Sequence, residues 1–394
     1  MYIPRAASGT LQRLARGFPV LHVTGPRQSG KTTLARHERP DLPYRSLENL
    51  DVRSFAVDDP RGFLAQFPSG AILDEVQRVP ALLSYLQGIV DEGAGMGRFV
   101  LTGSQQPALT AQVSQSLAGR VGRVELLPLS GAELIGVDRI PSDLETALWT
   151  GGFPAIFDRD VTPTEWLANY TATYVERDVR QVLGIRDQER FITFTRAVAA
   201  RSAQLLNTAS LGSDIGVSAP TVRAWISILQ ATYVVALLRP HSTNATSKLV
   251  KAPEVVVLDS GLMCSLIGIT EPAQLFVHPL RGAVFETWGI GELMKAYLNT
   301  GREPALGYLR DQHGNEIDCV VRTPDGLVPV EFKAGRTFAS DWAAPMHRWL
   351  ARTSQWPWLE PTIVYGGDDS MVRSGVRLLS WHDFAQDPLG RLHS

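Results

Sequence analysis

Short apolar runs, each bounded by polar or turn-forming residues, recur along the N-terminal part of the chain. The clearest are residues 18–24 (FPVLHVT), 69–74 (SGAILD) and 98–104 (RFVLTGS). Short continuous apolar runs predict strands buried on both faces, and the helix-length segments between them predict crossover connections. We therefore expect an α/β fold built on a parallel sheet, with ligands bound at the carboxyl ends of the strands.

The rest of the chain continues this pattern and then departs from it. Residues 1–17 have apolar positions at helical spacing, and residues 51–67 predict a helix broken at Pro60. Residues 144–238 are mostly helix-compatible, whereas residues 255–258, 317–321 and 327–332 are strand-like again. We expect three domains, which cover residues 1–135, 136–240 and 241–394.

The first apolar run passes directly into GPRQSGKT, which has the GxxxxGKT spacing of a phosphate-binding P-loop. Gly25 and Gly30 let the backbone curl so that its N–H groups face phosphate, and the following helix adds the positive end of its dipole. Lys31 is expected to reach the β- and γ-phosphates of ATP, and Thr32 to offer its hydroxyl to Mg²⁺. The expected nucleotide-binding residues are Gly25, Pro26, Arg27, Gln28, Ser29, Gly30, Lys31, Thr32 and Thr33.

The second apolar run ends in Asp74 and Glu75, an acidic pair that a P-loop ATPase needs at this place. Asp74 is expected to hold Mg²⁺, and Glu75 to polarise the attacking water, a role for a carboxylate that is not itself a metal ligand. The third run ends in TGSQ, where we expect Ser104 or Gln105 to sense the γ-phosphate or orient water. Simple termination of the strand by Gly and Ser is the alternative.

Arg120 and Arg123 follow the third run in the sequence SLAGRVGRVEL. Phosphoryl transfer needs positive charge beside the γ-phosphate, which an arginine supplies from the same chain or from a neighbouring subunit. Either arginine is a candidate, and two solvated arginines flanking a strand are the alternative. If one acts on a neighbouring subunit, the protein forms a head-to-tail homo-oligomer, and such interfaces close into rings.

Composition sets the outer limits. The chain has 394 residues, 44% hydrophobic and 20% charged, which is typical of a globular protein with two or three domains. Its net charge of -2 argues neither for nor against a nucleic-acid partner. Cys264 and Cys319 lack CxxC spacing, which excludes a cysteine-based zinc site and fits a reducing compartment. No apolar run reaches membrane-spanning length and residues 1–18 lack a signal-peptide core, so we expect a soluble cytoplasmic protein.

The middle region predicts a winged helix-turn-helix within residues 205–238. A short helix is followed by a turn near Gly216, by a second helix that Ser218 opens with Pro220 in its first turn, and by a strand that forms the wing. A DNA-binding interpretation places Thr221 and Arg223 in the major groove. The second helix carries a single basic residue, so a purely structural winged helix stays equally open.

A second candidate site lies in the C-terminal third. Asp318 precedes a Pro-Asp-Gly turn at residues 324–326, and Glu331 and Lys333 follow it on one face of the next strand. Nucleases of the D…ExK type use two carboxylates to bind Mg²⁺ and a lysine to orient or activate water. Glu286, in an earlier helical segment, is expected to add a third carboxylate. A hairpin with exposed charges is the alternative.

Together these pieces resemble a family of bacterial and archaeal AAA-type ATPases that carry a C-terminal domain of unknown function similar to a PD-(D/E)xK, restriction-endonuclease-like nuclease. The matching sequences are GPRQSGKTT, ILDEVQ, LTGSQ, LAGRVGRVELLPLSGAEL, GGFP, YVERDV, VVLDSGL and EID…VEFK, spread over nearly the whole chain. The resemblance implies ATP binding with hydrolysis and leaves the cellular role open. Ile317 stands where the nuclease motif has proline, which does not exclude activity.

Two functions follow from these observations. The first is a Mg²⁺-dependent ATPase that couples its nucleotide state to a C-terminal module directed at nucleic acid, with DNA favoured, which either cleaves or binds it. The second is a nucleotide-gated scaffold or switch whose nuclease-like domain is inactive and binds protein. Fold analogy does not choose between them, because one fold hosts many functions.

Overall fold

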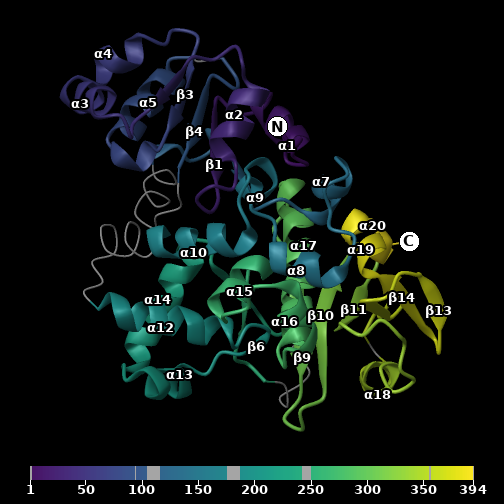
Figure 1. Cartoon of the computed structure of the whole chain (residues 1–394). Coiled ribbons are helices and arrows are strands. Elements are labelled where there is room, and N and C mark those ends of the chain that lie inside the picture. Colours follow the sequence, from purple (N-terminus) through teal and green to yellow (C-terminus); the bar gives the residue numbers. More distant parts are fainter. Residues whose placement is uncertain are drawn as a thin grey trace. The chain divides into compact units, whose positions relative to one another are not determined.

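The structure, a computed structural model, describes residues 2–93, 95–103, 116–174, 187–241, 250–354 and 356–393 (Figure 1). Its contacts divide the chain into two compact units. The first unit holds Met1–Leu129, Ala231–Tyr233 and Tyr297–Glu303, and the second holds Ser130–Gln230, Val234–Ala296 and Pro304–Ser394. By this measure the middle and C-terminal regions form one unit, and their division into two domains stays a prediction.

The first unit is built on a five-stranded parallel sheet, as the apolar runs predict. Its strands lie in the order β2-β3-β4-β1-β5 and span Tyr44–Ser46, Ala71–Asp74, Phe99–Thr102, Val20–Thr24 and Val121–Glu125, respectively. The helices are α1 Ser8–Ala15, α2 Lys31–Glu38, α3 Leu50–Asp58, α4 Pro60–Ala65 and α5 Leu82–Asp91, with a short 3-10 turn, η1, at Val76–Arg78. The predicted break at Pro60 is confirmed, because Asp59 caps α4 there by accepting a hydrogen bond from Gly62 N.

Alternate side chains of the central strands enter two separate cores, as the two-residue period of a strand requires. On one face, Val20, Leu73 and Phe99 pack with apolar residues of α3, α4 and α5. On the other face, Leu21 and Val100 pack with residues of α1 and α2. Both faces of the sheet are thus covered, which explains why its strands read as continuous apolar runs.

The strand order determines which residues meet at the carboxyl ends of the strands, where a parallel sheet binds ligands. Strand β4 lies between β1 and β3, and all three are parallel. The P-loop follows β1, Asp74 ends β3 and Thr102 ends β4. These three features therefore lie together at the carboxyl ends of the strands.

The second unit begins with helices and a small antiparallel sheet. The helices of its first part are α7 Gly131–Ile135, α8 Leu144–Thr150, α9 Pro154–Asp158, α10 Pro163–Tyr174, α12 Gln188–Ala199, α13 Thr208–Ile215 and α14 Ala219–Ala231. Strands β6 Gln204–Leu205, β7 Val235–Leu238 and β8 Glu254–Val257 pair in the order β6-β8-β7. No helix among the described residues is both long and apolar enough to cross a bilayer.

The C-terminal part of the second unit holds a six-stranded mixed sheet in the order β13-β14-β12-β11-β10-β9. The strands are β9 Leu306–Arg310, β10 Glu316–Arg322, β11 Leu327–Lys333, β12 Thr362–Tyr365, β13 Met371–Arg373 and β14 Val376–Ser380. The helices are α15 Ser260–Leu266, α16 Pro272–Val277, α17 Arg281–Asn299, α18 Ala343–Arg352, α19 Trp381–Gln386 and α20 Gly390–His393. Strands β9, β10 and β11 are antiparallel neighbours, whereas β11, β12 and β14 are parallel.

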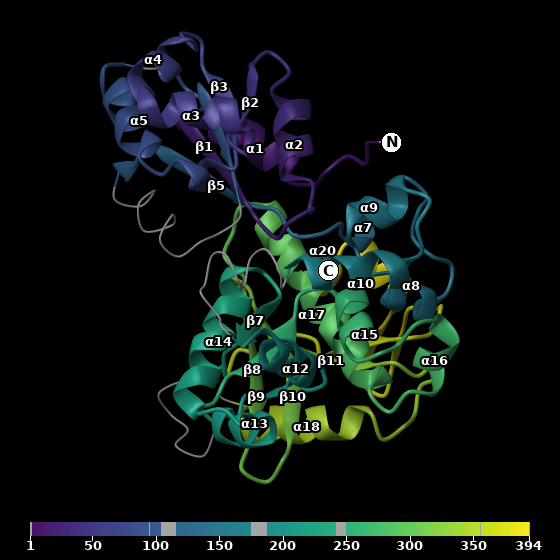
Figure 2. The same cartoon turned by 60° about the vertical axis from the view of Figure 1, so that its left-hand side comes forward.

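Helix α17 packs across this sheet, as Figures 1 and 2 both show. The rings of Phe285 on α17 and Phe332 on β11 meet edge to face with centroids 6.3 Å apart. A Cβ on Gly289 would lie 2.1 Å from Phe332 Cε1, so only glycine lets the helix approach this closely. This packing brings Glu286, one residue after Phe285, to the sheet that carries Asp318 and Glu331.

Candidate functional site

The P-loop has the backbone geometry that its sequence predicts. Gly30 caps α2 with a φ of 93°, and Gln28 has a φ of 59°, both in the left-handed region. Gly25 has no room for a side chain, because an added Cβ would lie 2.1 Å from the carbonyl oxygen of Leu126 at the end of β5. The loop is therefore folded tightly against β5. Pro26 and Ser29 lie inside it, and Gln28 and Thr33 are exposed.

Lys31 is buried and bends back over this loop. Its Nζ donates to the carbonyl oxygens of Pro26 at 2.6 Å and Gly25 at 3.1 Å. The ammonium thus lies at the centre of the curled backbone, where a phosphate-binding lysine is required.

Asp74 is the centre of a network of hydroxyl groups at the carboxyl ends of the strands. Its Oδ1 accepts hydrogen bonds from Thr32 at 3.0 Å and from Thr102, and its Oδ2 accepts one from Tyr44 at 2.7 Å. Burial, followed by the hydrogen bond to Asp74, raises the pKa of Tyr44 to about 12. Three elements, α2, β2 and β4, therefore fix the orientation of one buried carboxylate at the end of β3.

Glu75 lies beside Asp74 in a strained backbone conformation, with a φ of 57°. Burial raises the pKa of its carboxyl above the ordinary value, and the positive charges of Arg27 and Lys31 oppose that rise. Gln77 donates a hydrogen bond to Glu75 Oε2. Glu75 is thus a half-buried carboxylate with a raised pKa beside a second carboxylate, a pattern that is typical of general bases.

Three residues of this network were not singled out in the sequence. Tyr44 and Thr102 both contact Asp74, and Gln77 contacts Glu75. The signal for Thr102 is its position at the end of the third apolar run, the place where a sensor residue was expected. Ser104 and Gln105, the residues predicted for that role, lie outside the described residues.

Arg120 and Arg123 are not brought to the P-loop of their own chain. The carbonyl of Arg120 accepts a hydrogen bond from Val20 N at the start of β1, and its guanidinium forms a two-pronged pair with Asp91 at the end of α5. Arg123 is level with His22 in the middle of β1, where burial, helped by the Arg123 charge, lowers the pKa of His22 to about 4. Arg120 lies at the amino ends of the strands, whereas the P-loop follows the carboxyl end of β1, so the structure does not bring Arg120 to the P-loop of its own chain. Among the arginines, Arg27 has a charge that acts on Glu75, in addition to the charge of Lys31.

In the C-terminal sheet, the predicted D…ExK residues do come together. Lys333 Nζ lies 2.6 Å from Glu331 Oε2 and 3.8 Å from Asp318 Oδ2, and Asp318 Oδ2 also accepts a hydrogen bond of 2.8 Å from Phe332 N. Burial works to lower the pKa of Lys333, but the charges of Asp318 and Glu331 outweigh it and raise the value. The predicted hairpin and the shared face of Glu331 and Lys333 are confirmed.

Asp318, together with Glu286, borders a cavity of about 300 Å³ that is rich in carboxylates. It is lined by Ala203, Gln204, Glu254, Ala283, Glu286, Arg310, Glu316, Ile317 and Asp318. Burial, with the charges of Asp318 and Glu254, raises the pKa of Glu286 well above its ordinary value. Burial likewise raises the pKa of Glu254 to about 8, although Arg310 opposes the shift. Glu254 on β8 was missed in the sequence, because a single glutamate before an apolar run signals no site.

The structure gathers these charges without assembling a metal site. Within the described ranges, no three His, Cys, Asp or Glu side chains are placed to hold one metal ion. Two of the carboxylate oxygens at the hairpin already accept hydrogen bonds within the protein. Lys333 Nζ donates to Glu331 Oε2, and the backbone N–H of Phe332 donates to Asp318 Oδ2. The second oxygen of Glu331, Oε1, is buried and has no hydrogen-bond partner among the described residues. The expected set Glu286, Asp318 and Glu331 is thus close in space but not arranged around one point.

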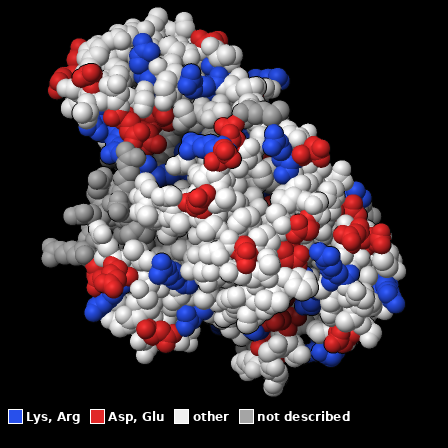
Figure 3. Space-filling view, in the orientation of Figure 1, with Lys and Arg blue, Asp and Glu red and all other residues white. Residues whose placement is uncertain are grey.

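The middle region matches the predicted order of elements around residues 205–238. Ser218 Oγ accepts a hydrogen bond from Thr221 N and also contacts the Thr221 hydroxyl at 2.8 Å, which caps α14. Arg223 is exposed on α14, whereas Trp225, Ile226 and Leu229 are buried. On the face shown in Figure 3, acidic and basic side chains are interspersed and form no extended basic surface.

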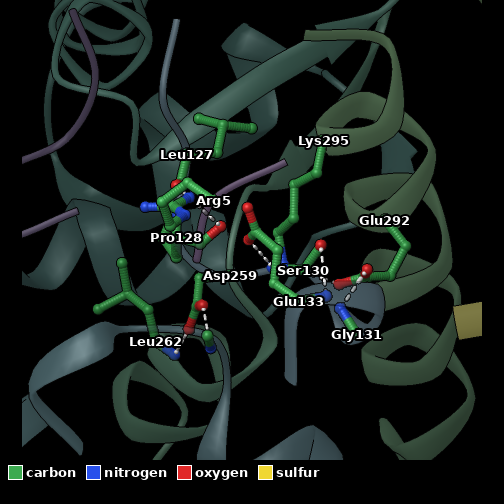
Figure 4. Close-up of polar contacts among 11 residues, drawn as sticks. Arg5, Leu127, Pro128, Ser130, Gly131, Glu133, Asp259, Leu262, Glu292 and Lys295 are labelled. Carbon is green, nitrogen blue, oxygen red and sulfur yellow. Dashed lines mark hydrogen bonds and ion pairs between the residues drawn. The ribbon is translucent and has the colours of Figure 1, made fainter. Parts of the chain in front are cut away.

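Three sequence motifs of the second unit turn out to be structural. Asp259, in LDSGL, accepts hydrogen bonds of 2.8 Å from Leu262 N and from Gly152 N of the GGFP motif (Figure 4). A Cβ on Gly151 would lie 2.3 Å from Asp259 Oδ1, and a Cβ on Gly261 would lie 2.8 Å from Gly151 N. Two glycines are therefore required where these motifs cross.

The third motif, PLSGAEL, is fixed by a buried ion pair on α17. Glu292 accepts a hydrogen bond of 2.8 Å from Gly131 N and pairs with Lys295 at 2.7 Å, and all three residues are buried (Figure 4). Ser130 and Glu133 form a reciprocal capping box at the start of α7. A buried pair of this kind is costly to break on one side only, so it fixes α7 to α17.

Three family models match successive stretches of the chain. Residues 17–135 match the family described as AAA domain, residues 141–273 match a domain of unknown function, DUF8612, and residues 281–384 match another, DUF4143. The chain is 33% identical over 326 residues to the uncharacterized protein Rv2008c of Mycobacterium tuberculosis, which covers 80% of this chain and 70% of that protein. It is 22% identical over 342 residues to an uncharacterized protein of Haemophilus influenzae, covering 78% of this chain and 81% of that protein.

Similarity to solved structures is weaker. A Walker-type ATPase of Pyrococcus abyssi is 13% identical and covers 66% of this chain and 94% of that one, with a TM-score of 0.42. A signal transduction ATPase with a tetratricopeptide repeat sensor from Pyrococcus horikoshii is 12% identical and covers 75% and 47%, with a TM-score of 0.29. Scores this low assign neither fold nor function.

The sequence relationship is decisive, and it agrees with the P-loop, the acidic pair and the parallel sheet described above. The chain belongs to the same family as the mycobacterial proteins, and it is an AAA-type P-loop ATPase whose C-terminal region is a DUF4143 domain.

Proposed function

We propose that this protein is a Mg²⁺-dependent ATPase whose nucleotide state controls a nucleic-acid-directed module in its C-terminal region. The observation that carries the ATPase part is the position of Asp74. It accepts hydrogen bonds from the P-loop residue Thr32 and from Tyr44 and Thr102, with Glu75 as its neighbour. This is the arrangement that metal-assisted phosphoryl transfer needs.

The residues around Asp74 fit a magnesium ion. Every donor is a hard oxygen, and the hydroxyl of Thr32 lies 3.0 Å from Asp74 Oδ1, so both can turn toward one ion. When bound with ATP, Mg²⁺ neutralises charge on the phosphates. Tyr44 and Thr102 hold the carboxylate in orientation, as outer partners of metal ligands do.

In this proposal, Glu75 accepts a proton from the attacking water. Its raised pKa brings it closer to the operating pH, which is what an efficient general base requires. Gln77 orients the carboxylate by donating to Oε2. Lys31 exchanges its bonds to the Gly25 and Pro26 carbonyls for phosphate oxygens, and the N–H groups of the loop complete the cradle.

The C-terminal module is proposed to act on a nucleic-acid phosphodiester. The order α17, β9, β10, β11, α18, β12 supports this, because a helix precedes three antiparallel strands and a second helix leads to a strand parallel to the third. Asp318, Glu331 and Glu286 would hold Mg²⁺, and Lys333 would orient water. Burial, followed by the charge of Asp318, raises the pKa of Glu286 and of Glu331, and a bound cation would stabilise their ionised forms.

The middle region supports nucleic acid as the partner. The order α12, β6, α13, α14, β7, β8 is compatible with the proposed winged helix, in which α14 would be the recognition helix. Thr221 and Arg223 of α14 would face a DNA groove, with DNA favoured over RNA.

The inactive scaffold is the second candidate, and a specific observation favours it. No three carboxylate, His or Cys side chains of the described ranges share a metal point, and Lys333 is tied to Glu331. A scaffold of this kind would keep the ATP-driven switch and bind protein through the C-terminal region.

One experiment separates the two candidates. Wild-type protein is incubated with a panel of DNA and RNA substrates and Mg²⁺ or Mn²⁺, with and without ATP, next to Asp318→Ala and Lys333→Ala. The nuclease proposal predicts cleavage that both substitutions abolish while ATP turnover persists. If no substrate is cleaved and no metal binding depends on Asp318, the nuclease proposal fails and the result supports the scaffold.

Assembly into a homo-oligomer is the remaining part of the proposal. Since Arg120 lies away from its own P-loop, it or Arg123 would act on the nucleotide of a neighbouring subunit. Hydrolysis per subunit would then rise with protein concentration, and a flat rate across the assembly transition would exclude this role.

A further inference from the structure

The N-terminal segment ahead of α1 carries a buried arginine that contacts the P-loop. Arg5 is 6% exposed, and its guanidinium donates hydrogen bonds to the carbonyl of Ser29 at 2.6 Å and to the carbonyl of Leu127 at 2.7 Å. A longer contact of 3.5 Å reaches the carbonyl of Pro128 (Figure 4). One side chain therefore joins the P-loop to the chain that leaves β5.

The rest of the segment holds Arg5 in this place. The ring of Tyr2 stacks on His37 of α2 with centroids 3.8 Å apart, and Ala7 is fully buried in the core beneath α1 and α2. The carbonyl of Arg5 also accepts a hydrogen bond of 3.0 Å from Ser8 N at the start of α1. The backbone on both sides of the arginine is thus fixed against the P-loop helix.

The bond to Ser29 determines the direction of the next N–H group. A peptide unit is planar and trans, so its C=O and N–H point in opposite directions. With the Ser29 carbonyl turned toward Arg5, the N–H of Gly30 must point away from Arg5. Gly30 has a φ of 93°, so this peptide plane can rotate at little steric cost unless something holds it.

The hydrogen bond from Arg5 to the Leu127 carbonyl anchors the arginine to the chain that leaves β5. The loop itself packs on the end of β5, since an added Cβ on Gly25 would strike the Leu126 carbonyl and Leu126 N donates to the Thr24 carbonyl at 2.8 Å. Arg5 bonds the next carbonyl along, Leu127, so it spans from the strand end to the far side of the loop. Its planar, always charged fork suits two carbonyls better than a lysine would.

We infer that Arg5 is a positioning residue for nucleotide binding, which orients the Ser29–Gly30 peptide so that the Gly30 N–H faces a phosphate. The inference rests on nucleotide binding at the P-loop and extends it to a residue far away in sequence. Arg5 makes no contact with the nucleotide in this scheme. It acts by holding one donor of the phosphate cradle in its binding direction.

The test is a comparison of nucleotide affinity and steady-state kinetics in full-length variants. Arg5→Ala should raise the Kd for ATP and for ADP about tenfold or more, the scale of losing a hydrogen bond to a charged donor. KM for ATP should rise in parallel, whereas kcat at saturating ATP should change less than about twofold, because Glu75 and Asp74 are untouched. Arg5→Lys should fall between wild type and Arg5→Ala.

Arg16→Ala is the matched control, because Arg16 is an exposed arginine in the same N-terminal region and its removal changes the charge equally. It should leave Kd and KM at wild-type values. Thermal unfolding without nucleotide shows how far each variant is folded, and Arg5→Lys keeps the test valid if Arg5→Ala unfolds.

Three outcomes decide the inference. A rise in Kd and KM at constant kcat, partly reversed in Arg5→Lys, supports it. A lower unfolding temperature with wild-type Kd and KM means that Arg5 only stabilises the fold, and the inference fails while the ATPase proposal stands. If the wild-type protein binds no nucleotide, both the inference about Arg5 and the ATPase proposal fail.

Discussion

The hydroxyl of Thr32 donates a hydrogen bond of 3.0 Å to Oδ1 of Asp74, which joins the first turn of the P-loop helix to the end of β3. These two residues lie 42 positions apart in sequence, and the strands that lead to them, β1 and β3, are not neighbours in the sheet. The contact exists because β4 lies between β1 and β3, so the loop after β1 and the end of β3 face each other across Thr102. The metal proposal depends on this relationship.

Asp74→Asn should separate metal-dependent from metal-independent steps. The amide keeps the shape of the side chain but loses the charge, and ATP turnover should fall by about 100-fold or more while ATP without Mg²⁺ still binds. Phosphate release and nucleotide affinity, each with and without Mg²⁺, measure this. Asp51→Asn, at an exposed carboxylate of α3, is the control and should behave as wild type. Equal turnover by the two variants would exclude Asp74 as the metal ligand.

The raised pKa of Glu75 predicts the acid side of the pH profile. Only the ionised carboxylate accepts a proton from water, so kcat should fall as pH drops through the pKa of Glu75, above the ordinary glutamate value of 4.5. Arg27 opposes the rise, so Arg27→Ala should move this limb to higher pH when kcat is measured at saturating ATP. A limb that stays in place or moves to lower pH would contradict the assignment of Glu75.

Gly151→Ala should destabilise the second unit much more than the same substitution at another left-handed glycine of that unit. Gly151 has a φ of 67° and an added Cβ would lie 2.3 Å from Asp259 Oδ1, whereas Gly268 has a φ of 85° and open space around it. Gly268→Ala should cost about 1 kcal/mol for the backbone conformation alone. Gly151→Ala should cost roughly 3 kcal/mol or more, since it also displaces a buried carboxylate. Chemical denaturation measures both, and equal costs would show that the crossing tolerates a side chain.

The carboxylate cavity predicts a pH-dependent stability. The pKa of Glu254 is about 8 in the folded protein against an ordinary 4.5, so between these values the folded state holds a proton that the unfolded state has lost. The free energy of unfolding therefore falls as pH rises through this window, and the loss is complete above about pH 8. Glu254→Gln should remove that dependence and stabilise the protein above the window, with little effect below it.

Glu271→Gln is the matched control for Glu254, because it neutralises an exposed glutamate of the same unit. Denaturant midpoints at several pH values measure both variants. If Glu254→Gln tracks wild type at every pH, the carboxylate is not held protonated in the fold.

The sequence was most informative where chemistry and chain order coincide. The P-loop, the acidic pair and the parallel sheet follow from local patterns, because glycine spacing and buried strands leave a signal within a few residues. Tyr44 gives no such signal, since its contact with Asp74 depends on β2 pairing with β3 in the register that sets Ser46 beside Asp74. Arg5 is still further from any local pattern, being 24 residues from Ser29 and 122 from Leu127.

The C-terminal candidate site shows the same limit. Alternation along one strand predicts that Glu331 and Lys333 share a face, and the short distance between them confirms it. Whether three carboxylates reach one point depends on side-chain rotamers and on α17 packing over the sheet, which spacing along the chain does not encode. Glu254 enters the cavity from β8, a strand of another sheet, and only the tertiary structure brings it there.

In the proposed function, the P-loop site binds ATP and Glu75 drives its hydrolysis. The direct measurement is phosphate release under saturating Mg²⁺ and ATP by wild type, Glu75→Gln and Lys31→Ala, with nucleotide affinity determined for each. We predict slow turnover by wild type, wild-type affinity with at least about 100-fold slower turnover for Glu75→Gln, and no binding by Lys31→Ala. Equal phosphate release from wild type and Glu75→Gln, at equal ATP occupancy, would contradict the account.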